Sequence, residues 1–378
     1  MTPGTALDQK SSKQLLTIQY LRGVASVMVV LHHIRNPWPN LYNPLEHFEM
    51  GEAGVDIFFI ISGVVMYVSS RVESPAVFAG LRVIRVAPLY WILTLCAVTL
   101  LLLSGGAKPG FALVNDVMLS AMFVPHHSSI FPGTIWPVLN PGWTLYFEMF
   151  FYLIFAIGLF FRKPLLISLC VISFLVGLGL FVSTDESIFH TYSHPFLMYT
   201  HPLMLEFAAG IVLGWLFLNG KVPNVWLLLP IGFLALIAAH IVRLPYLFLQ
   251  NGLCAALIML GAIAAERAFR IRDIGWLRLL GDASYSIYLT HALTLFVVRR
   301  LFLRLPLEGM LQFVSFVILA ATISLLVGFA VYFKVERPLT RWLRSQFLTV
   351  FAAARRGAGR PLREAPPSPV SVAQSAGE

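Results

Sequence analysis

Long apolar runs separated by short polar segments dominate the hydrophobic pattern of this 378-residue chain. A helix needs about 20 apolar residues to cross a bilayer, with a range of about 17–25. The run over 113–124 is shorter and contains Asn115 and Asp116, so it favours a re-entrant or interfacial segment. The other apolar runs predict an all-α, polytopic membrane bundle with about ten transmembrane helices. These runs are 16–34, 54–69, 88–104, 143–161, 165–182, 203–218, 226–243, 247–265, 283–303 and 311–333.

The composition agrees with a membrane protein. Hydrophobic residues make up 58% of the chain and charged residues 12%, whereas a typical soluble domain is about 25% charged. So few charges cannot cover a water-facing surface of this size, which excludes a soluble enzyme and a disordered chain. The net charge of +9 belongs to no separate basic module, so nucleic-acid binding is also excluded.

The distribution of Lys and Arg predicts the orientation, because these residues gather on the cytoplasmic side of membrane proteins. If the N-terminus is cytoplasmic, the inner segments hold 20 of the 27 Lys and Arg residues and the outer segments hold six. With ten spans, both termini are then inside. The chain divides into a cytoplasmic tail over 1–14, a transmembrane domain over 15–345 and a disordered cytoplasmic tail over 346–378.

The first apolar run carries two polar residues that need a reason to be there, since a charge at the bilayer centre costs about 2.5–3.5 kcal/mol on insertion scales. Arg22 and His33 are eleven positions apart, which places them about 20° apart around a helix and about 16 Å apart along it. The pair predicts a polar stripe from the inner to the outer side. Alternatively, Arg22 extends to the inner headgroups and His33 lies at the outer interface.

Three further apolar runs contain an acidic residue. Asp56 begins the second run, where it is either an ordinary acid at a helix start or part of a site. Glu148 lies inside the fourth run, one helical turn before Tyr152, and a carboxylate there must face a cavity or a cation. Glu206 in the sixth run is interpreted in the same way, with a structural partner favoured.

Arg82 and Arg85 lie between the second and third runs, just before Pro88, in what we expect to be a cytoplasmic loop. Residues at i and i+3 share one helix face. The pair anchors the inner side electrostatically, or it forms a clamp for phosphate, because guanidinium groups match phosphate oxygens.

The last two runs also carry polar residues. Tyr285 and Tyr288 fit an aromatic belt at the interface, and His291 lies half-way along the ninth run as either a core histidine or a site residue. Pro338 is expected to end the tenth helix, with Glu336 in a structural role. No metal site is expected, because the spacing of the polar loop residues matches no metal template. These residues are His126, His127, Asp185, Glu186, His190 and His194.

Taken in order, these segments resemble the acyltransferase 3 family of integral membrane O-acyltransferases. The resemblance covers about residues 15–345 and rests on six motifs in the right order. They are Arg22 to His33 for Arg-x10-His, Asp56 in a Gly-Val-Asp-Ile-Phe-Phe block, Arg82 and Arg85 for Arg-x-x-Arg, Trp143 to Tyr152 for Trp-Ser-Leu-x-x-Glu-x-x-Phe-Tyr, Ser284 to His291 for Ser-Tyr-x-x-Tyr-Leu-x-His, and Glu336 to Pro338 for Glu-x-Pro.

Within the family, the chain is most similar to the exopolysaccharide O-acetyltransferases of bacterial inner membranes. Gln19 stands where many members have an Asp, and no esterase-like domain follows the last run. The Gln19 departure removes a carboxylate near Arg22 and leaves Arg22 freer to meet an anionic ligand.

The resemblance implies transfer of an acetyl group from cytoplasmic acetyl-CoA, a co-substrate, to a hydroxyl of an extracytoplasmic or lipid-linked saccharide. No permanently bound cofactor is implied. The partners are the saccharide, membrane lipid and other polysaccharide-assembly proteins. His33 is either a general base or the acyl acceptor, with Glu148 and Asp56 orienting it. The remaining roles are CoA binding by Arg22, Arg82 and Arg85, and support by Trp143, Tyr152, Tyr288 and His291.

Two alternatives stay open. The acceptor is a lipid head group, a peptide or a small metabolite, or the protein is a non-enzymatic solute or proton transporter that uses the same buried polar residues. The sequence shows no internal repeat of the transporter kind, and the pair Arg82 and Arg85 favours an enzyme that binds a phosphorylated donor.

Overall fold

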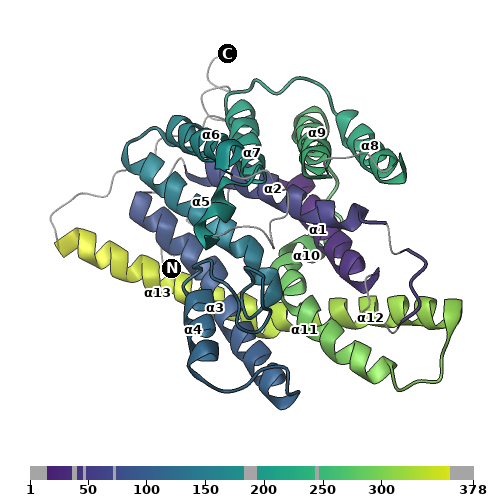
Figure 1. Ribbon diagram of the computed structural model, residues 1–378. Coiled ribbons are helices and arrows are strands. Elements are labelled where there is room, and N and C mark those ends of the chain that lie inside the picture. The colour runs from purple at the N-terminus through teal and green to yellow at the C-terminus, as the bar shows by residue number, and fades with distance from the viewer. Residues whose placement is uncertain are drawn as a thin grey trace, which may run out of the picture.

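The computed structural model describes residues 15–35, 41–45, 48–70, 74–182, 194–242 and 247–357. Throughout these ranges every regular element is a helix, which confirms the predicted all-α class (Figure 1). The α-helices are α1 (Leu16–Arg35), α2 (Ala53–Ser69), α3 (Pro75–Leu103), α4 (Phe111–Ala121), α5 (Trp143–Phe160), α6 (Pro164–Val182), α7 (Met204–Leu218), α8 (Leu228–Val242), α9 (Leu247–Ala268), α10 (Gly275–Asp282), α11 (Ser284–Phe302), α12 (Gly309–Val331) and α13 (Arg337–Gly357). The other helical segments are η1 (Met50–Glu52), η3 (Asn140–Gly142), η4 (Pro195–Thr200) and the π-helical η5 (Tyr332–Glu336).

Each of the ten predicted apolar runs lies within one of these α-helices or overlaps most of it. In the described part of the chain, six helical stretches are long and apolar enough to cross a membrane. The count of ten spans and the inside location of both termini stay predictions. The six stretches are Met50–Ser69, Pro75–Leu103, Asn140–Phe160, Pro164–Phe181, Gln250–Ala268 and Gly309–Ala354.

Helix α3 corrects the predicted loop between the second and third runs. It begins at Pro75, whose fixed φ suits the first helical position, and the Ser74 hydroxyl accepts a hydrogen bond from the Val77 N–H. Arg82 and Arg85 therefore lie inside a helix and not in a loop. The prediction failed because two arginines interrupt the apolar run while the backbone continues as a helix.

The chain after α12 corrects two further predictions. Pro338 does not end the helix, because the helical stretch Gly309–Ala354 runs through it, with the π-helical segment Tyr332–Glu336 directly before it. The predicted boundary at 345 falls inside α13, so residues 346–357 are helical and not a disordered tail. The remainder of that predicted tail, 358–378, and the predicted N-terminal tail, 1–14, lie outside the described residues.

The short helix α4 is followed by an irregular segment that its acidic residue holds in place. Asp116, which is buried, accepts hydrogen bonds from the Ser129 N–H and hydroxyl, each at 2.8 Å. His126 is buried too, with its Nε2 3.9 Å from Asp116. The buried ring of His126 therefore lies near α4 and does not face solvent.

Helices α2 and α7 pack more closely than any side chain would allow. A Cβ at Gly63 would lie 2.5 Å from the Phe207 carbonyl oxygen, and a Cβ at Gly210 would lie 2.3 Å from the Ile60 carbonyl oxygen. Small residues permit such approaches between membrane helices. The pairing continues at Gly214, so the two helices run parallel, with their first turns at the same end of the bundle.

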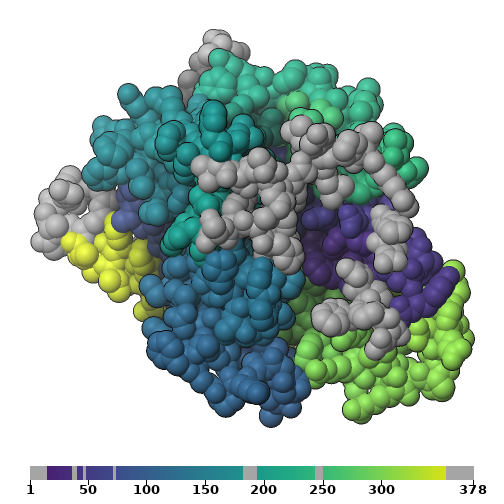
Figure 2. Space-filling view, viewed as in Figure 1, coloured from purple at the N-terminus to yellow at the C-terminus, as the bar shows by residue number. Residues whose placement is uncertain are grey.

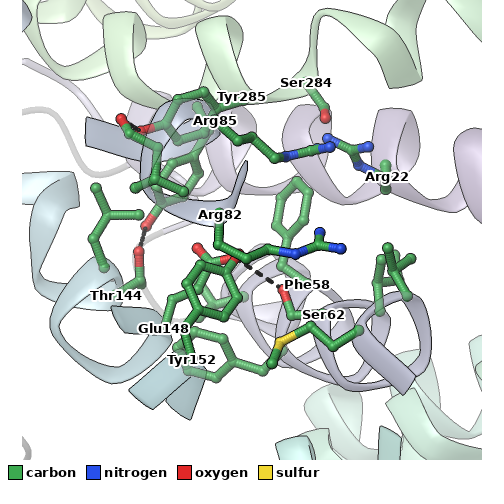
Figure 3. Close-up of a pocket in the computed structure, with 18 residues that line it drawn as sticks. Arg22, Phe58, Ser62, Arg82, Arg85, Thr144, Glu148, Tyr152, Ser284 and Tyr285 are labelled. Carbon is green, nitrogen blue, oxygen red and sulfur yellow. Dashed lines mark hydrogen bonds between the residues drawn. The ribbon is translucent and has the colours of Figure 1, made fainter. Parts of the chain in front are cut away.

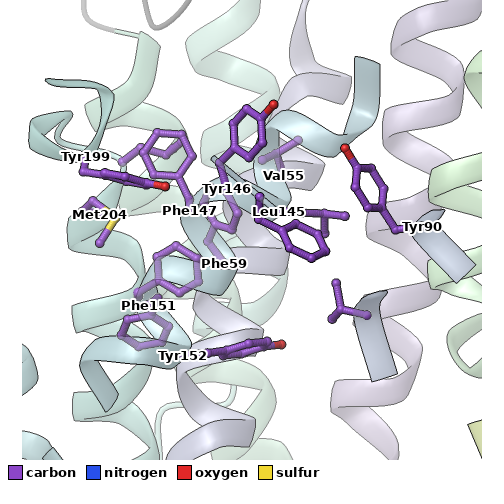
Figure 4. Close-up of a cluster of buried hydrophobic side chains, with 14 of the residues drawn as sticks. Val55, Phe59, Tyr90, Leu145, Tyr146, Phe147, Phe151, Tyr152, Tyr199 and Met204 are labelled. Atoms are coloured by element: carbon purple, nitrogen blue, oxygen red, sulfur yellow. The ribbon is translucent and has the colours of Figure 1, made fainter. Parts of the chain in front are cut away.

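An aromatic core lies beside this contact (Figure 4). The Phe207 ring centroid is 4.5 Å from that of Phe59 and 4.3 Å from that of Phe151, and all three side chains are buried. On another side of α2, the N-terminal helix α1 also packs against α10 and α11, although these come late in the chain (Figures 1 and 2). The fold thus brings polar residues from both ends of the sequence together.

Candidate active site

A pocket lies among α1, α2, α3, α5 and α11, with an empty volume of about 770 Å³ including its open part. Its apolar walls come mostly from α2. Three guanidinium groups and one carboxylate face it, so the lining carries an excess of positive charge (Figure 3). The polar lining residues are Arg22, Ser62, Arg82, Arg85, Thr144, Glu148, Tyr152, Ser284, Tyr285 and Tyr288.

The arginines reach the pocket from two helices. Arg82 and Arg85 are three positions apart on α3, so they project from one face of that helix. The Arg82 Nη2 donates to the Ser69 hydroxyl at 2.5 Å, and its guanidinium carbon lies 5.2 Å from the centre of the Phe78 ring. These contacts hold the side chain in place. The structure therefore brings together the three arginines that the sequence assigned to the donor.

Gln19 has a role that the sequence did not reveal. Its amide oxygen accepts a hydrogen bond from Arg22 at 3.3 Å, and its amide nitrogen donates to Asp282 at 3.0 Å. The Asp282 carboxylate of α10 therefore lies near Arg22, but the Gln19 amide bridges the two side chains. Because an amide without charge makes the direct contact, the Arg22 charge remains available to a ligand in the pocket.

Glu148 lines this pocket and does not contact His33. Its Oε1 accepts hydrogen bonds from the Ser62 hydroxyl at 3.2 Å and the Tyr152 hydroxyl at 2.5 Å. Its described hydrogen bonds go to these two hydroxyl groups, and a role of Glu148 toward His33 stays a prediction. Its carboxylate offsets part of the arginine charge and fixes two hydroxyl groups at the pocket wall.

Glu336 is a site residue that the sequence analysis placed in a structural role. Its Oε2 accepts a hydrogen bond from the Ser286 hydroxyl at 2.5 Å, and its charge acts on Arg22 and Arg85. The π-helical segment that ends at Glu336 changes the helix register before α13 begins. The Glu-x-Pro motif marked this position, but nothing in its spacing pointed to the arginines.

His33 lies at the other end of α1, exposed, and its Nδ1 is 2.9 Å from the Val29 carbonyl oxygen. A carbonyl can only accept, so Nδ1 carries the hydrogen and Nε2 keeps its lone pair. The His33 ring centroid lies 5.1 Å from that of His32 and 4.9 Å from that of His291. The structure therefore presents one accessible imidazole nitrogen beside a second, buried histidine.

Tyr288 connects the histidines with the pocket. Its ring centroid is 5.8 Å from that of His291, and the residue also lines the pocket. Its hydroxyl is 2.9 Å from the Thr144 hydroxyl and donates to the Pro141 carbonyl at 3.1 Å. Neighbouring side chains therefore connect the end of α1 with the pocket wall, in the order His33, His291, Tyr288 and Thr144.

Two other predicted site residues lie elsewhere. Trp143 packs against Phe147, with ring centroids 6.1 Å apart, outside the pocket lining. Asp56, 3% exposed, shares a side-chain hydrogen bond with Glu206 of α7, which is 5% exposed. One proton must lie between two carboxyl groups that are hydrogen-bonded to each other.

Asp56 also faces away from His33. Gly51 and Gly54 contact α1, since a Cβ at Gly54 would lie 2.5 Å from the Ala25 carbonyl oxygen. Asp56 is two positions, or about 200°, further around α2, on the side of α7. The described partner of Asp56 is Glu206, which thus has the structural partner that we favoured, and a role of Asp56 toward His33 stays a prediction.

No group of three or more His, Cys, Asp and Glu side chains suited to a metal ion occurs among the described residues. Asp185, Glu186 and His190 lie outside those residues. His194 stacks on Phe196, with ring centroids 5.5 Å apart.

These features define a helical membrane protein with an arginine-lined pocket and, at the other end of α1, a histidine with a free ring nitrogen. The chain matches the acyltransferase 3 family model, described as an acyltransferase domain, over residues 15–333. It is also 37% identical over 321 residues to "Exopolysaccharide production protein ExoZ" of Rhizobium meliloti (strain 1021), covering 82% of this chain and 96% of that protein. No solved structure matches the chain. The protein belongs to the acyltransferase 3 family and is a membrane acyltransferase, which confirms the resemblance.

Proposed function

We propose that this protein transfers an acetyl group from cytoplasmic acetyl-CoA to a hydroxyl group of an extracytoplasmic or lipid-linked saccharide in the bacterial inner membrane. The family supports acyl transfer, and the name of the relative ExoZ supports a role in exopolysaccharide production. One observation carries the proposal: a pocket lined by Arg22, Arg82 and Arg85 is joined to His33 by contacting side chains, Tyr288 at the pocket wall and then His291.

The arginines suit the donor because coenzyme A is a polyanion with a diphosphate and a ribose phosphate. Guanidinium groups bind phosphate oxygens in pairs and keep their charge when partly buried. In the proposed orientation the pocket opens to the cytoplasm, and the thioester end of the donor points along α1 toward His33.

His33 supplies the base in this proposal. As the saccharide oxygen attacks the thioester carbonyl, its O–H bond breaks and the proton moves to the His33 Nε2. The new C–O bond replaces the C–S bond, and the departing CoA thiolate then takes up a proton. A route in which the His33 Nε2 itself attacks the thioester and carries the acetyl group needs the same free nitrogen.

The acetyl content of exported polysaccharide tests the proposal. We expect His33→Ala to reduce it by about 10²-fold or more, because general base catalysis contributes about 10²–10⁴-fold. His127→Ala, at an exposed histidine outside the site, is the control and should leave acetylation unchanged. Normal acetylation in a His33→Ala strain with wild-type membrane expression would refute the role of His33.

A further inference from the structure

We propose that His291 is the positioning residue of His33: it holds the ring of His33 and shares the proton that His33 removes from the acceptor hydroxyl. This inference rests on the proposed acetyl transfer and assigns a role that a carboxylate has in most histidine-based sites. It follows from the geometry of the two rings and from where the nearby carboxylates lie.

The two rings leave the same nitrogen free. The Nδ1 of His33 donates to the Val29 carbonyl, and the Nδ1 of His291 donates to the Tyr288 carbonyl. Each neutral ring therefore has its lone pair on Nε2. With ring centroids 4.9 Å apart, an N–H formed at the His33 Nε2 has an acceptor of the right kind beside it.

In the described part of the chain, the Nε2 of His291 lacks a hydrogen-bond donor. The side chain is fully buried at 0% exposure, and among the described residues its Nε2 has no hydrogen-bond partner. A buried polar atom without a partner costs about 1–3 kcal/mol, so few are kept without a reason. A proton held between the two Nε2 atoms would satisfy His291 at the moment when His33 becomes charged.

No described carboxylate competes for this role. Glu148 binds hydroxyl groups at the pocket wall, and Asp56 binds Glu206 on the far side of α2. The titratable side chains that act on His291 are His33 and His32, both on α1, and Tyr288 lies beside it on α11. The charge on His33 is therefore met by a neutral imidazole.

The proton taken from the acceptor hydroxyl must also be held until the thiolate forms. The acceptor loses its hydroxyl proton to His33 as the C–O bond forms, whereas the CoA thiolate gains a proton only after the C–S bond has broken. The histidine pair keeps the proton during the interval between these two events, and Tyr288 places the pair next to the pocket. Acetyl transfer by this route consumes and releases no net proton.

The test uses purified full-length protein in nanodiscs, with radiolabelled acetyl-CoA and de-O-acetylated exopolysaccharide from a strain that lacks the gene. His291→Gln keeps a polar side chain but cannot share the proton. We expect its kcat to fall about 10- to 100-fold, a share of the contribution of general base catalysis, with an unchanged KM for acetyl-CoA. We also expect the acid limb of its rate–pH profile to move relative to wild type. His291→Asn, which can still donate to the Tyr288 carbonyl, replaces it if the Gln variant does not fold.

His240→Gln is a matched control. His240 on α8 is also buried, its Nδ1 also donates to a carbonyl one turn earlier, Leu236, and its Nε2 also lacks a partner among the described residues. Its ring lies beside Phe48 and its charge acts on His32, but it contacts neither His33 nor His291, so the kcat and pH profile of His240→Gln should match wild type. Equal losses in His240→Gln and His291→Gln would mean that any buried histidine matters structurally.

The outcomes separate this inference from the proposed function. If His33→Ala transfers acetyl groups as fast as wild type, the proposed function fails. If His33→Ala is inactive but His291→Gln keeps the wild-type kcat and pH profile, only the role of His291 is refuted. If the double variant His33→Gln/His291→Gln is no slower than His33→Gln, His291 acts through His33.

Discussion

Two groups of charged side chains lie within the same apolar bundle, and they are built differently. In the pocket lining, Arg22, Arg82 and Arg85 outnumber Glu148 and face empty space, while Glu336 and Asp282 act on Arg22 from outside the lining. Between α2 and α7, Asp56 and Glu206 bind each other and face none. The first arrangement leaves charge for a ligand, and the second uses its polar atoms to join two helices. A charged residue in a membrane helix therefore marks a site only when its partners leave it unneutralised.

The largest effect should come from the pocket. We expect the double variant Arg82→Ala/Arg85→Ala to weaken acetyl-CoA binding about 10²–10⁴-fold, because each hydrogen bond to a charged group is worth about 1.5–3 kcal/mol. Isothermal titration of the protein in nanodiscs measures the affinity. Arg341→Ala/Arg344→Ala is the control, since these exposed arginines have the same spacing on α13. Equal affinity in both double variants would make Arg82 and Arg85 anchors to the membrane and not a donor clamp.

The carboxyl pair should respond in stability and not in binding. Asp56→Ala leaves the buried Glu206 without its partner, which costs about 1–3 kcal/mol. We expect a lower midpoint in thermal unfolding monitored by fluorescence size-exclusion chromatography, with unchanged acetyl-CoA affinity in the protein that stays folded. If Asp56→Ala lost acetyl-CoA affinity but kept its full stability, the carboxyl pair and the arginine pocket would belong to one site.

The close contact between α2 and α7 at Gly210 should also affect stability and not binding. Gly210→Ala places a Cβ against the Ile60 backbone and should destabilise the protein by about 1–3 kcal/mol. Gly177→Ala on α6 meets no atom within 4 Å and is the matched control. Equal unfolding midpoints for the two variants would show that α2 and α7 are not held at this distance.

The smallest effect should come from replacing one carboxyl group of the pair by an amide. Asp56→Asn keeps a hydrogen bond to Glu206 and supplies the hydrogen that the pair needs, so stability should change by less than about 1 kcal/mol. Acetyl transfer should stay at the wild-type rate. A large loss of transfer in Asp56→Asn would mean that the proton of the pair takes part in the reaction.

The sequence predicted the parts of this fold that local pattern controls. Apolar runs located the helices, and the spacing of Arg22 and His33 placed both residues on one face of α1. It failed at α3 and α13, because charged residues and Pro338 interrupt an apolar run without ending a helix. The hydrophobic pattern shows which segments carry apolar side chains. Helix caps and the π-helical segment decide where a helix ends.

The partners of the site residues were harder to predict, because they depend on how distant helices pack. Asp56 begins a helix as expected, but the close approach of α2 and α7 decides that it meets Glu206 and not His33. Asp282 and Glu336 act on Arg22 only because α10 and η5 come back to α1. Side-chain direction around each helix follows from spacing, whereas the identity of the neighbour does not.

The central claim is that the arginine pocket holds the donor and leads to His33. A structure of the protein in nanodiscs with a non-transferable acetyl-CoA analogue tests it most directly. We expect the phosphates against Arg82 and Arg85, and the acyl carbon near the His33 Nε2, within the roughly 3–3.5 Å of a near-attack geometry once the acceptor oxygen is included. An analogue bound outside this pocket, or bound in it with its acyl end pointing away from α11 and His33, would contradict the account.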